Sequence, residues 1–169
     1  MSATGSRSKR RPALRVRPAT REDAAAIVGL IRGLAEYEKL LHECEATVAL
    51  IRRHGFGPKR YFETLICEQD GAAVGFALYF FTFSTFMARP TLYLEDLFVL
   101  PEHRGRGAGR ALLSALARIA VRKGCGRMEW AVLDWNAPSI GFYERLGARL
   151  RRDWILTRLT GPALRALAR

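Results

Sequence analysis

The chain has 169 residues, of which 49% are hydrophobic and 26% charged, so its composition excludes a collagen-like or wholly disordered protein. Its 28 Lys and Arg outnumber its 16 Asp and Glu, and the formal net charge of +12 at pH 7 invites the hypothesis of a polyanionic partner. Its three cysteines share no CxxC spacing, so we expect neither a disulfide framework nor a zinc site, and a reducing cytoplasmic location fits.

Much of the positive charge is concentrated at the N-terminus. The first 17 residues contain six Lys and Arg and no acid, whereas the remaining 152 residues carry 22 basic and 16 acidic side chains. Half of the net charge therefore comes from this short segment. Residues 1–12 are rich in Ser, Thr, Gly and Arg, which predicts a disordered basic tail before a folded domain over residues 13–169.

Helix-capping residues and the spacing of apolar residues predict the first secondary-structure elements. Leu14–Arg17 is an expected strand, and Thr20 with Asp23 indicates a capping box at the start of a helix over about 21–39. Further elements follow in chain order: a helix over 46–54, strands over 61–68, 73–83 and 91–99, a helix over 107–123, a strand over 127–133, a helix over 137–146, a strand region over 149–160 and a small helix from 161. This order predicts a mixed α/β fold with an antiparallel hairpin and a strand–helix–strand crossover.

The uncharged run from Gly71 to Ala88 reaches the lower length limit of a membrane-spanning helix. Its polar and aromatic residues favour a buried strand that runs into a loop. We therefore expect no membrane segment here.

A glycine-rich basic segment, Arg104–Gly109, follows the strand at 91–99 and opens the helix at 107–123. Glycines let a ligand approach the backbone, and the first N–H groups of a helix lack internal partners, so this arrangement is typical of an anion site. The arginines add charge for phosphate oxygens. The spacing matches neither the Walker loop nor the GxGxxG dinucleotide fingerprint.

The segment resembles the R/Q-x-x-G-x-G/A motif with which the GCN5-related N-acetyltransferase (GNAT) superfamily binds the pyrophosphate of acetyl-CoA. Asn136–Gly147 is similar to that superfamily's second cofactor segment, and the resemblance extends from Val16 to about Thr160. Tyr93–Val99 and Ala131–Tyr143 are similar to the spermidine/spermine and thialysine acetyltransferases. The resemblance implies a single GNAT-like α/β domain: a mixed, mostly antiparallel sheet flanked by helices, with a strand–helix–strand core that binds acetyl-CoA.

The resemblance implies three groups of contacts to acetyl-CoA. A strand would offer backbone groups to the pantetheine arm, the loop would bind the pyrophosphate, and Asn136 would contact the cofactor while also capping its helix. The residues are Leu97, Phe98, Val99, Arg104, Gly105, Arg106, Gly107, Ala108, Gly109, Arg110, Asn136, Ser139 and Tyr143.

Acetyl transfer to an alkylammonium, whose reference pKa is about 10.4, requires a group that takes its proton and a group that protonates the leaving thiolate. Glu95 and Asp96 are carboxylates in an otherwise apolar strand, where alternation would put them on opposite faces. The resemblance makes Glu95 the base, acting through water, and Tyr143 the acid. Judged from the residues alone, an ion pair for either carboxylate and core packing for Tyr143 remain alternatives.

The resemblance also implies a site for the acceptor amine. It would be lined by Tyr37, Glu38, Glu95, Asp96, Glu129, Trp130 and Ala131. Where polyamine enzymes carry an acidic Asp-Pro-Trp type segment, residues 84–90 of this chain contain no acid and include Arg89. This departure favours a small amine or amino acid over a long polycation.

We therefore expect an enzyme that transfers acetyl from acetyl-CoA to the primary amine of a small molecule, a diamine, polyamine or lysine-like amino acid, by direct attack in a ternary complex. The resemblance implies a homodimer, and we expect no metal cofactor. Two alternatives stay open: a protein or RNA acetyltransferase that uses the basic tail, and a non-catalytic nucleic-acid-binding protein. The sequence shows no RNP-like aromatics, helix-turn-helix signal or zinc ligands, so nucleic acid is not the expected partner.

Overall fold

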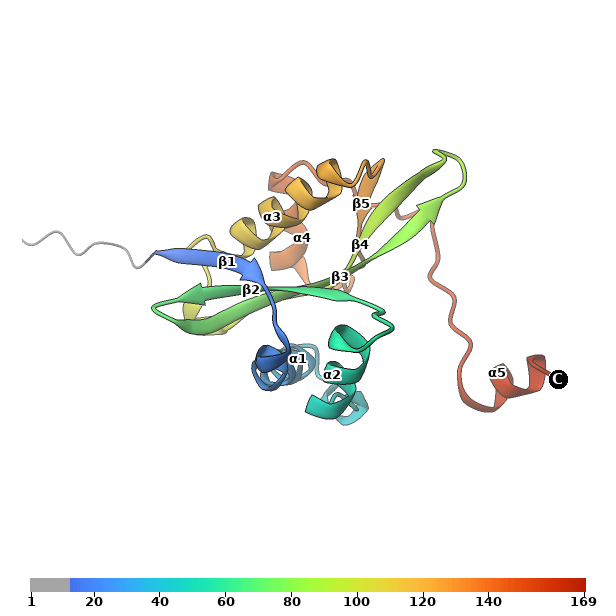
Figure 1. Ribbon diagram of the computed structural model, residues 1–169. Helices are drawn as coiled ribbons and strands as arrows, with labels where there is room; N and C mark the ends of the chain where they lie inside the picture. Colours follow the sequence, from blue (N-terminus) through green and yellow to red (C-terminus); the bar gives the residue numbers. More distant parts are fainter. Residues whose placement is uncertain (1–12) are drawn as a thin grey trace, which may run out of the picture. The chain divides into compact units, whose positions relative to one another are not determined.

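The computed structural model describes residues 13–169, which form a mixed α/β arrangement (Figure 1). The tail predicted over residues 1–12 lies outside the described residues. The chain divides into two compact units with the boundary between Ala131 and Val132, and each unit is described by itself.

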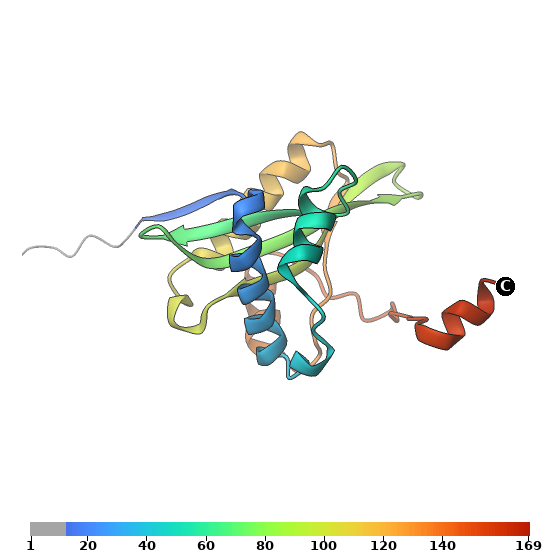
Figure 2. The same cartoon turned by 60° about the horizontal axis from the view of Figure 1, so that its bottom comes forward.

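The first unit is built on one five-stranded sheet with the order β1-β2-β3-β4-β5. Neighbouring strands are antiparallel except β4 and β5, which run parallel. Helices α1 and α2 lie on one face of the sheet and α3 on the other (Figure 1 and Figure 2). The elements are β1 (Leu14–Pro18), α1 (Ala24–Tyr37), α2 (Val48–Phe56), β2 (Glu63–Gln69), β3 (Ala72–Ser84), β4 (Arg89–Val99), α3 (Ala108–Arg122) and β5 (Arg127–Glu129).

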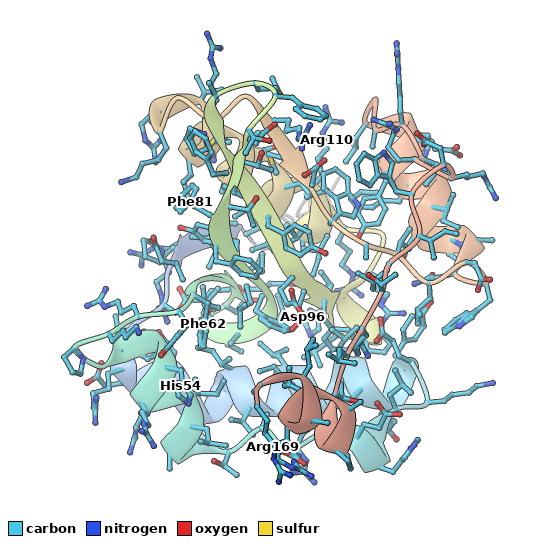
Figure 3. All side chains as sticks on the ribbon, turned by 90° about the vertical axis from the view of Figure 1, so that its right-hand side faces the viewer. His54, Phe62, Phe81, Asp96, Arg110 and Arg169 are labelled. Atoms are coloured by element: carbon cyan, nitrogen blue, oxygen red, sulfur yellow. The ribbon has the colours of Figure 1, made fainter. Side chains whose placement is uncertain are left out.

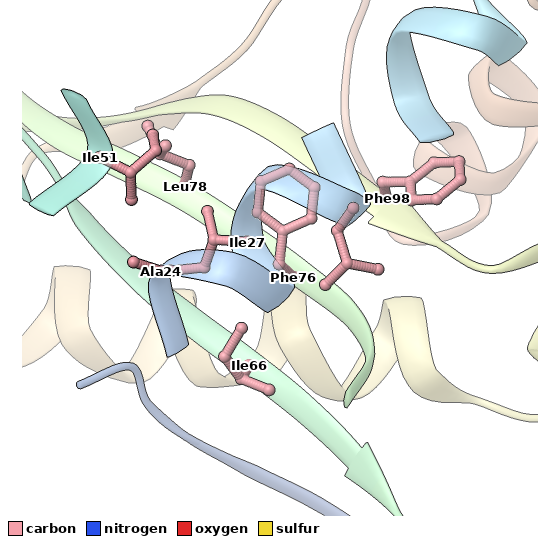
Figure 4. Close-up of a cluster of buried hydrophobic side chains, with 8 residues drawn as sticks. Ala24, Ile27, Ile51, Ile66, Phe76, Leu78 and Phe98 are labelled. Carbon is pink, nitrogen blue, oxygen red and sulfur yellow. The ribbon is translucent and has the colours of Figure 1, made fainter. Parts of the chain in front are cut away.

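A buried apolar cluster joins α1 and α2 to the sheet (Figure 4). Ile27 of α1 and Ile66 of β2 are fully buried, and burial of an aliphatic side chain of this size contributes about 1.5–3 kcal/mol. Gly75 lets β3 and β4 approach closely, because a Cβ there would lie 2.7 Å from the Phe98 carbonyl oxygen. The cluster consists of Ala24, Ile27, Leu30, Ile51, Ile66, Phe76, Leu78 and Phe98.

Most of the predicted elements are present with shifted ends. The strand predicted within the uncharged run is confirmed as β3, and no helix among residues 13–169 is long and apolar enough to cross a membrane. The backbone N–H of Thr20 donates to Asp23 Oδ2 at 2.7 Å, as a capping box requires. The first turn, Arg21–Asp23, is nevertheless a 3₁₀ helix, and α1 begins only at Ala24.

Two strand predictions near the C-terminus differ from the structure, one in its length and the other in its existence. The strand expected over 127–133 is shortened to Arg127–Glu129, and residues 149–160 form no strand. The second unit instead contains two helices, α4 (Ala137–Arg145) and α5 (Gly161–Leu167). An apolar pattern indicates which side chains favour burial, but a strand also requires a neighbour that completes its hydrogen-bond ladder, and residues 154–156 are exposed.

Arg17 links the start of α1 to the sheet. Its guanidinium donates to both carboxylate oxygens of Asp23, at 2.6 and 2.8 Å, and its Nε donates to Glu68 Oε1 at 2.8 Å. These charge-assisted bonds lower the pKa of Asp23 from 3.8 to about 2, mainly through the Arg17 hydrogen bond. Arg17 therefore joins β1, β2 and the turn before α1.

Because the folded pKa of Asp23 lies below its unfolded value, Asp23 stabilises the fold above about pH 4, and this stability is lost as the pH falls towards about 2. We expect Asp23→Asn to lower the free energy of unfolding at pH 7 by about 2 kcal/mol. Urea unfolding of the variant and wild type between about pH 3 and pH 7 measures this difference. Asp153→Asn, which breaks an exposed pair with Arg151, is the matched control and should leave stability unchanged. Equal stability of Asp23→Asn and wild type at pH 7 would contradict the assignment.

Candidate active site

A bulge in β4 sets the position of Glu95. Asp96 pairs with Leu78 of β3, but the next pair joins Leu94 to Tyr79, so Glu95 is an extra residue without an opposite partner on β3. Such a bulge interrupts side-chain alternation and re-aims the residues at it. The expectation that Glu95 and Asp96 point to opposite faces rested on regular alternation, which does not hold here. Glu95 is exposed and Asp96 half-buried.

Asp96 interacts with two other acids, and it lies among the side chains in the middle of Figure 3. Burial raises the pKa of its carboxyl from 3.8 to about 7, and the negative charges of Glu95 and Glu38 add to the effect. Burial also raises the pKa of Glu38, which follows the last residue of α1. The structure thus brings two of the predicted acceptor-site residues, Glu95 and Glu38, within electrostatic reach of a third, Asp96. We refer to Glu38, Glu95 and Asp96 as the acidic cluster.

The other predicted acceptor-site residues lie at the end of β5 and at the end of α1. Glu129 forms an ion pair with Arg127 at 3.0 Å, and Trp130 and Ala131 follow it directly. The sequence-based prediction missed Tyr93, whose pKa is raised by burial and by the charges of Glu95 and Glu129. Tyr93 lies two residues before Glu95 and opens the Tyr93–Val99 stretch, which is a local signal, but only the pairing of β4 with β5 places it opposite Glu129.

Beside the acidic cluster, β4 loses one of its neighbours. The ladder between β4 and β5 covers only Thr91 to Tyr93, whereas β3 pairs with β4 up to Val99. The N–H of Leu100 donates to Val74 of β3, so by alternation the backbone groups of Phe98 face β3 and those of Leu97 and Val99 face the open edge. Of the three predicted backbone contacts, Leu97 and Val99 therefore face this edge, and the Val99 carbonyl oxygen already accepts a hydrogen bond from Arg104 Nε.

The glycine-rich loop follows β4 and begins α3. Gly105 and Gly107 have φ of 70° and 96°, values that favour glycine. The N–H of Ala111 donates to Gly107 O at 2.9 Å and closes the first turn, so the N–H groups of Ala108, Gly109 and Arg110 stand at the helix end without intrahelical partners. Together with the helix dipole, they have the geometry that is typical of an anion site, and the binding of phosphates here stays a prediction.

The three arginines of the loop region differ in their surroundings. Arg106 and Arg110 are exposed (Figure 3 labels Arg110), as expected of side chains that bind phosphate oxygens. Arg104 is also exposed as a whole, but its Nε donates to the Val99 carbonyl oxygen at 2.9 Å. Its guanidinium lies 4.7 Å from the Tyr37 ring centroid and 5.3 Å from that of Phe98. Tyr37, predicted to line the acceptor site, thus contacts the cofactor loop.

The remaining predicted residues belong to the second unit. Asn136 is buried and caps α4, because its side-chain oxygen accepts a hydrogen bond from the Ser139 N–H at 3.3 Å. Tyr143 is buried within α4, and its ring centroid lies 5.3 Å from that of Phe142. The helix-cap role of Asn136 is confirmed. The cofactor contacts of Asn136 and Ser139, and the acid role of Tyr143, stay predictions.

Comparison with known proteins decides which family has this combination of features. The model of the acetyltransferase (GNAT) family matches residues 32–148. The chain belongs to this family. It is 38% identical over 165 residues to the thialysine N-epsilon-acetyltransferase of Mus musculus, covering 91% of this chain and 96% of that protein. This confirms the superfamily and the thialysine branch that the sequence resembles, and it makes the chain an N-acetyltransferase.

This GNAT protein is also similar in sequence to a second acetyltransferase and in structure to a solved protein. The chain is 45% identical over 98 residues to L-ornithine N5-acetyltransferase NATA1 of Arabidopsis thaliana, covering 58% of this chain and 43% of that protein. An integron cassette protein of V. cholerae matches its structure with a TM-score of 0.78 and 26% identity, covering 92% of this chain and 97% of that one. The mixed, mostly antiparallel GNAT-like sheet flanked by helices is thereby confirmed.

The raised pKa of Asp96 in the acidic cluster can be tested by titration. We expect carbon-13 NMR of the Asp96 carboxyl to show a pKa of about 7, and both Glu95→Gln and Glu38→Gln to lower it because each removes a nearby negative charge. Glu95→Gln should have the larger effect, since Glu95 is the stronger of the two charge influences.

The raised pKa of Asp96 also predicts that the stability of the fold depends on pH. Because the folded pKa of Asp96 lies above its ordinary 3.8, the folded state binds more protons between about pH 4 and pH 7, and wild type should lose stability as the pH rises through this range. Asp96→Asn should remove that slope. Glu102→Gln, an exposed change outside the cluster, is the control. A carboxyl that titrates at about pH 4 would contradict this account.

Proposed function

We propose that the protein acetylates the terminal primary amine of a small cationic molecule, a lysine-like diamino acid or a diamine, using acetyl-CoA in a ternary complex. The observation that carries the proposal is the arrangement along β4. This strand places the acidic cluster, an open sheet edge and a glycine-rich helix start within one compact unit. An acidic group suits the ammonium, and the other two features suit a long phosphorylated thioester.

The residues present fit acetyl-CoA. Partnerless N–H groups at the start of α3 and the exposed Arg106 and Arg110 suit its phosphates, and the absence of side chains at Gly105 and Gly107 leaves room for them. The edge groups of Leu97 and Val99 suit the amides of its pantetheine arm, as an added strand would. When bound, acetyl-CoA supplies an acetyl group activated as a thioester. Asn136 and Ser139 are the proposed contacts from the second unit.

The acidic cluster has two roles in this proposal. Its negative charge attracts the ammonium of the acceptor to a protein whose net charge would repel it. Glu95, exposed at the bulge, then takes the ammonium proton through a water molecule. Asp96, whose pKa burial raises to about 7, is partly protonated at neutral pH and so reduces the repulsion that a second full negative charge would exert beside Glu95.

The amine freed of its proton forms a bond to the acetyl carbon while the carbon–sulfur bond breaks. The nitrogen then loses a second proton to solvent. Tyr143 is the proposed donor of the proton that the leaving thiolate needs, and it regains this proton from solvent. Its phenol has a reference pKa of about 10 and is therefore protonated at neutral pH. Its place in a segment that resembles the second GNAT cofactor segment supports this role.

Two relatives support a diamino acid as acceptor. Their names, thialysine N-epsilon-acetyltransferase and L-ornithine N5-acetyltransferase, both specify the side-chain nitrogen of a diamino acid. The acid-free segment at residues 84–90 lies at the far end of the hairpin, about 20 Å along β4 from Glu95 at the usual rise of a strand. Its lack of acids, which by sequence favours a small amine, therefore does not change the charge around the acidic cluster, and the preference for a small acceptor rests on the relatives. The homodimer and the cytoplasmic location stay predictions.

Removing the proposed acid or base tests the chemistry. We expect Glu95→Gln and Tyr143→Phe each to lower kcat by about 10²–10⁴, because general acid–base catalysis contributes rate factors of this size. Amine-dependent thiol release, followed between about pH 6 and pH 9, measures it. Glu102→Gln and Tyr61→Phe are matched exposed controls and should retain wild-type rates. If both proposed site variants kept wild-type rates over this range, the mechanism would be wrong.

An acceptor panel tests the substrate class. Thialysine, lysine, ornithine, diamines and polyamines should be compared by kcat/KM, and we expect the diamino acids to give the highest values. Glu38→Gln should raise the KM for cationic acceptors several-fold and leave the KM for acetyl-CoA unchanged, because it removes only an acceptor-side charge. A preference for peptide or RNA acceptors would refute the small-amine proposal.

A further inference from the structure

The Arg104 side chain is held at three points at the start of the cofactor loop. Its Nε donates to Val99 O at 2.9 Å, and its guanidinium lies 4.7 Å from the Tyr37 ring centroid and 5.3 Å from the Phe98 centroid. A planar guanidinium stacks on aromatic rings and gains cation–π attraction there. Arg104 therefore links the end of β4 to the end of α1.

The rings that hold Arg104 are themselves fixed by α1 and the core. Phe98 is buried, and its ring is so close to α1 that a Cβ added at Gly33 would lie 3.0 Å from it. Tyr37 is the last residue of α1. Gly105 and Gly107, which follow Arg104, have no side chains with which to anchor the loop. The position of the loop thus depends on how firmly Arg104 is held.

We propose that Tyr37 is a positioning residue for the cofactor, acting through Arg104, rather than a residue of the acceptor site alone. Its ring keeps the guanidinium over Val99 and so keeps the loop in the form that receives the pyrophosphate. The proposal rests on the proposed use of acetyl-CoA. Under this proposal the end of α1 serves both binding sites: Glu38 contributes charge to the acceptor site, and Tyr37 positions the loop that binds the cofactor.

Direct binding of coenzyme A, measured by calorimetry without any acceptor, tests the proposal on the full chain. We expect Tyr37→Leu to weaken binding about three- to tenfold, the range that corresponds to a cation–π contact of ordinary strength. Tyr37→Phe, which keeps the ring, should bind like wild type. Arg104→Lys keeps the charge but loses the planar fork, so it should weaken binding to a similar extent.

The double variant Tyr37→Leu with Arg104→Lys completes a thermodynamic cycle. Because a lysine could still contact the Tyr37 ring, the cycle is repeated with Arg104→Gln, which removes the cation. If Tyr37 acts through Arg104, adding Tyr37→Leu to Arg104→Gln should weaken binding by less than about twofold. Tyr61→Leu removes another cation–π tyrosine, with Lys59 Nζ at 5.3 Å from its ring centroid, and is the matched control that should bind like wild type. Thermal unfolding of each variant verifies that it is folded at the assay temperature.

Two results would overturn the proposal. One is unchanged coenzyme A binding in Tyr37→Leu, with only the KM for the acceptor raised; the other is full additivity in the double variant. Failure of wild type to bind coenzyme A would refute the proposed function as well. If the coupling is found but no small amine is acetylated, the positioning role stands and the proposed acceptor is wrong.

Discussion

The parting of β4 from β5 after Tyr93 is the constraint on which the rest of the candidate site depends. β3 continues to pair with β4 as far as Val99, so β4 stays rigid while its other edge is open. Unpaired backbone groups at a buried edge are unfavourable unless something satisfies them. Arg104 satisfies the Val99 carbonyl, and the remaining edge groups suit the amides of an extended ligand. The bulge at Glu95 occurs on the same strand, interrupts side-chain alternation there and leaves this carboxylate exposed.

The charged side chains near β4 form two groups of opposite sign. Three arginines, Arg104, Arg106 and Arg110, lie around the start of α3, and three acids lie at the bulge and at the end of α1. The strand β4 thus carries the acids Glu95 and Asp96 within its span, and the three arginines follow its end. The net charge of +12 is therefore no indication of nucleic acid by itself, since half of it belongs to the first 17 residues.

Membership of the GNAT family determines the reaction class, but the choice of acceptor depends on the residues around the acceptor site. An amine close to Glu95 feels the carboxylates of Asp96 and Glu38 more strongly than charges farther away, which solvent and salt screen. Burial raises the pKa of Asp96 to about 7, so its carboxyl is partly protonated near neutral pH and its charge in the acidic cluster varies with pH in this range. Tyr143 and Asn136 belong to the second unit, where α4 fixes them by its own cap and packing.

The sequence by itself determined the mixed α/β order, the glycine-rich loop before a helix, and the residues that resemble the family's site. These are local patterns: apolar spacing, glycine positions and motif letters are all contained in short stretches of chain. Only the tertiary structure decided that Glu95 occupies a bulge, that Tyr93 lies between Glu95 and Glu129, and that Tyr37 contacts Arg104. It also showed that residues 149–160 form no strand. Register, burial and strand pairing depend on residues far apart in the chain, so no local pattern could have specified them.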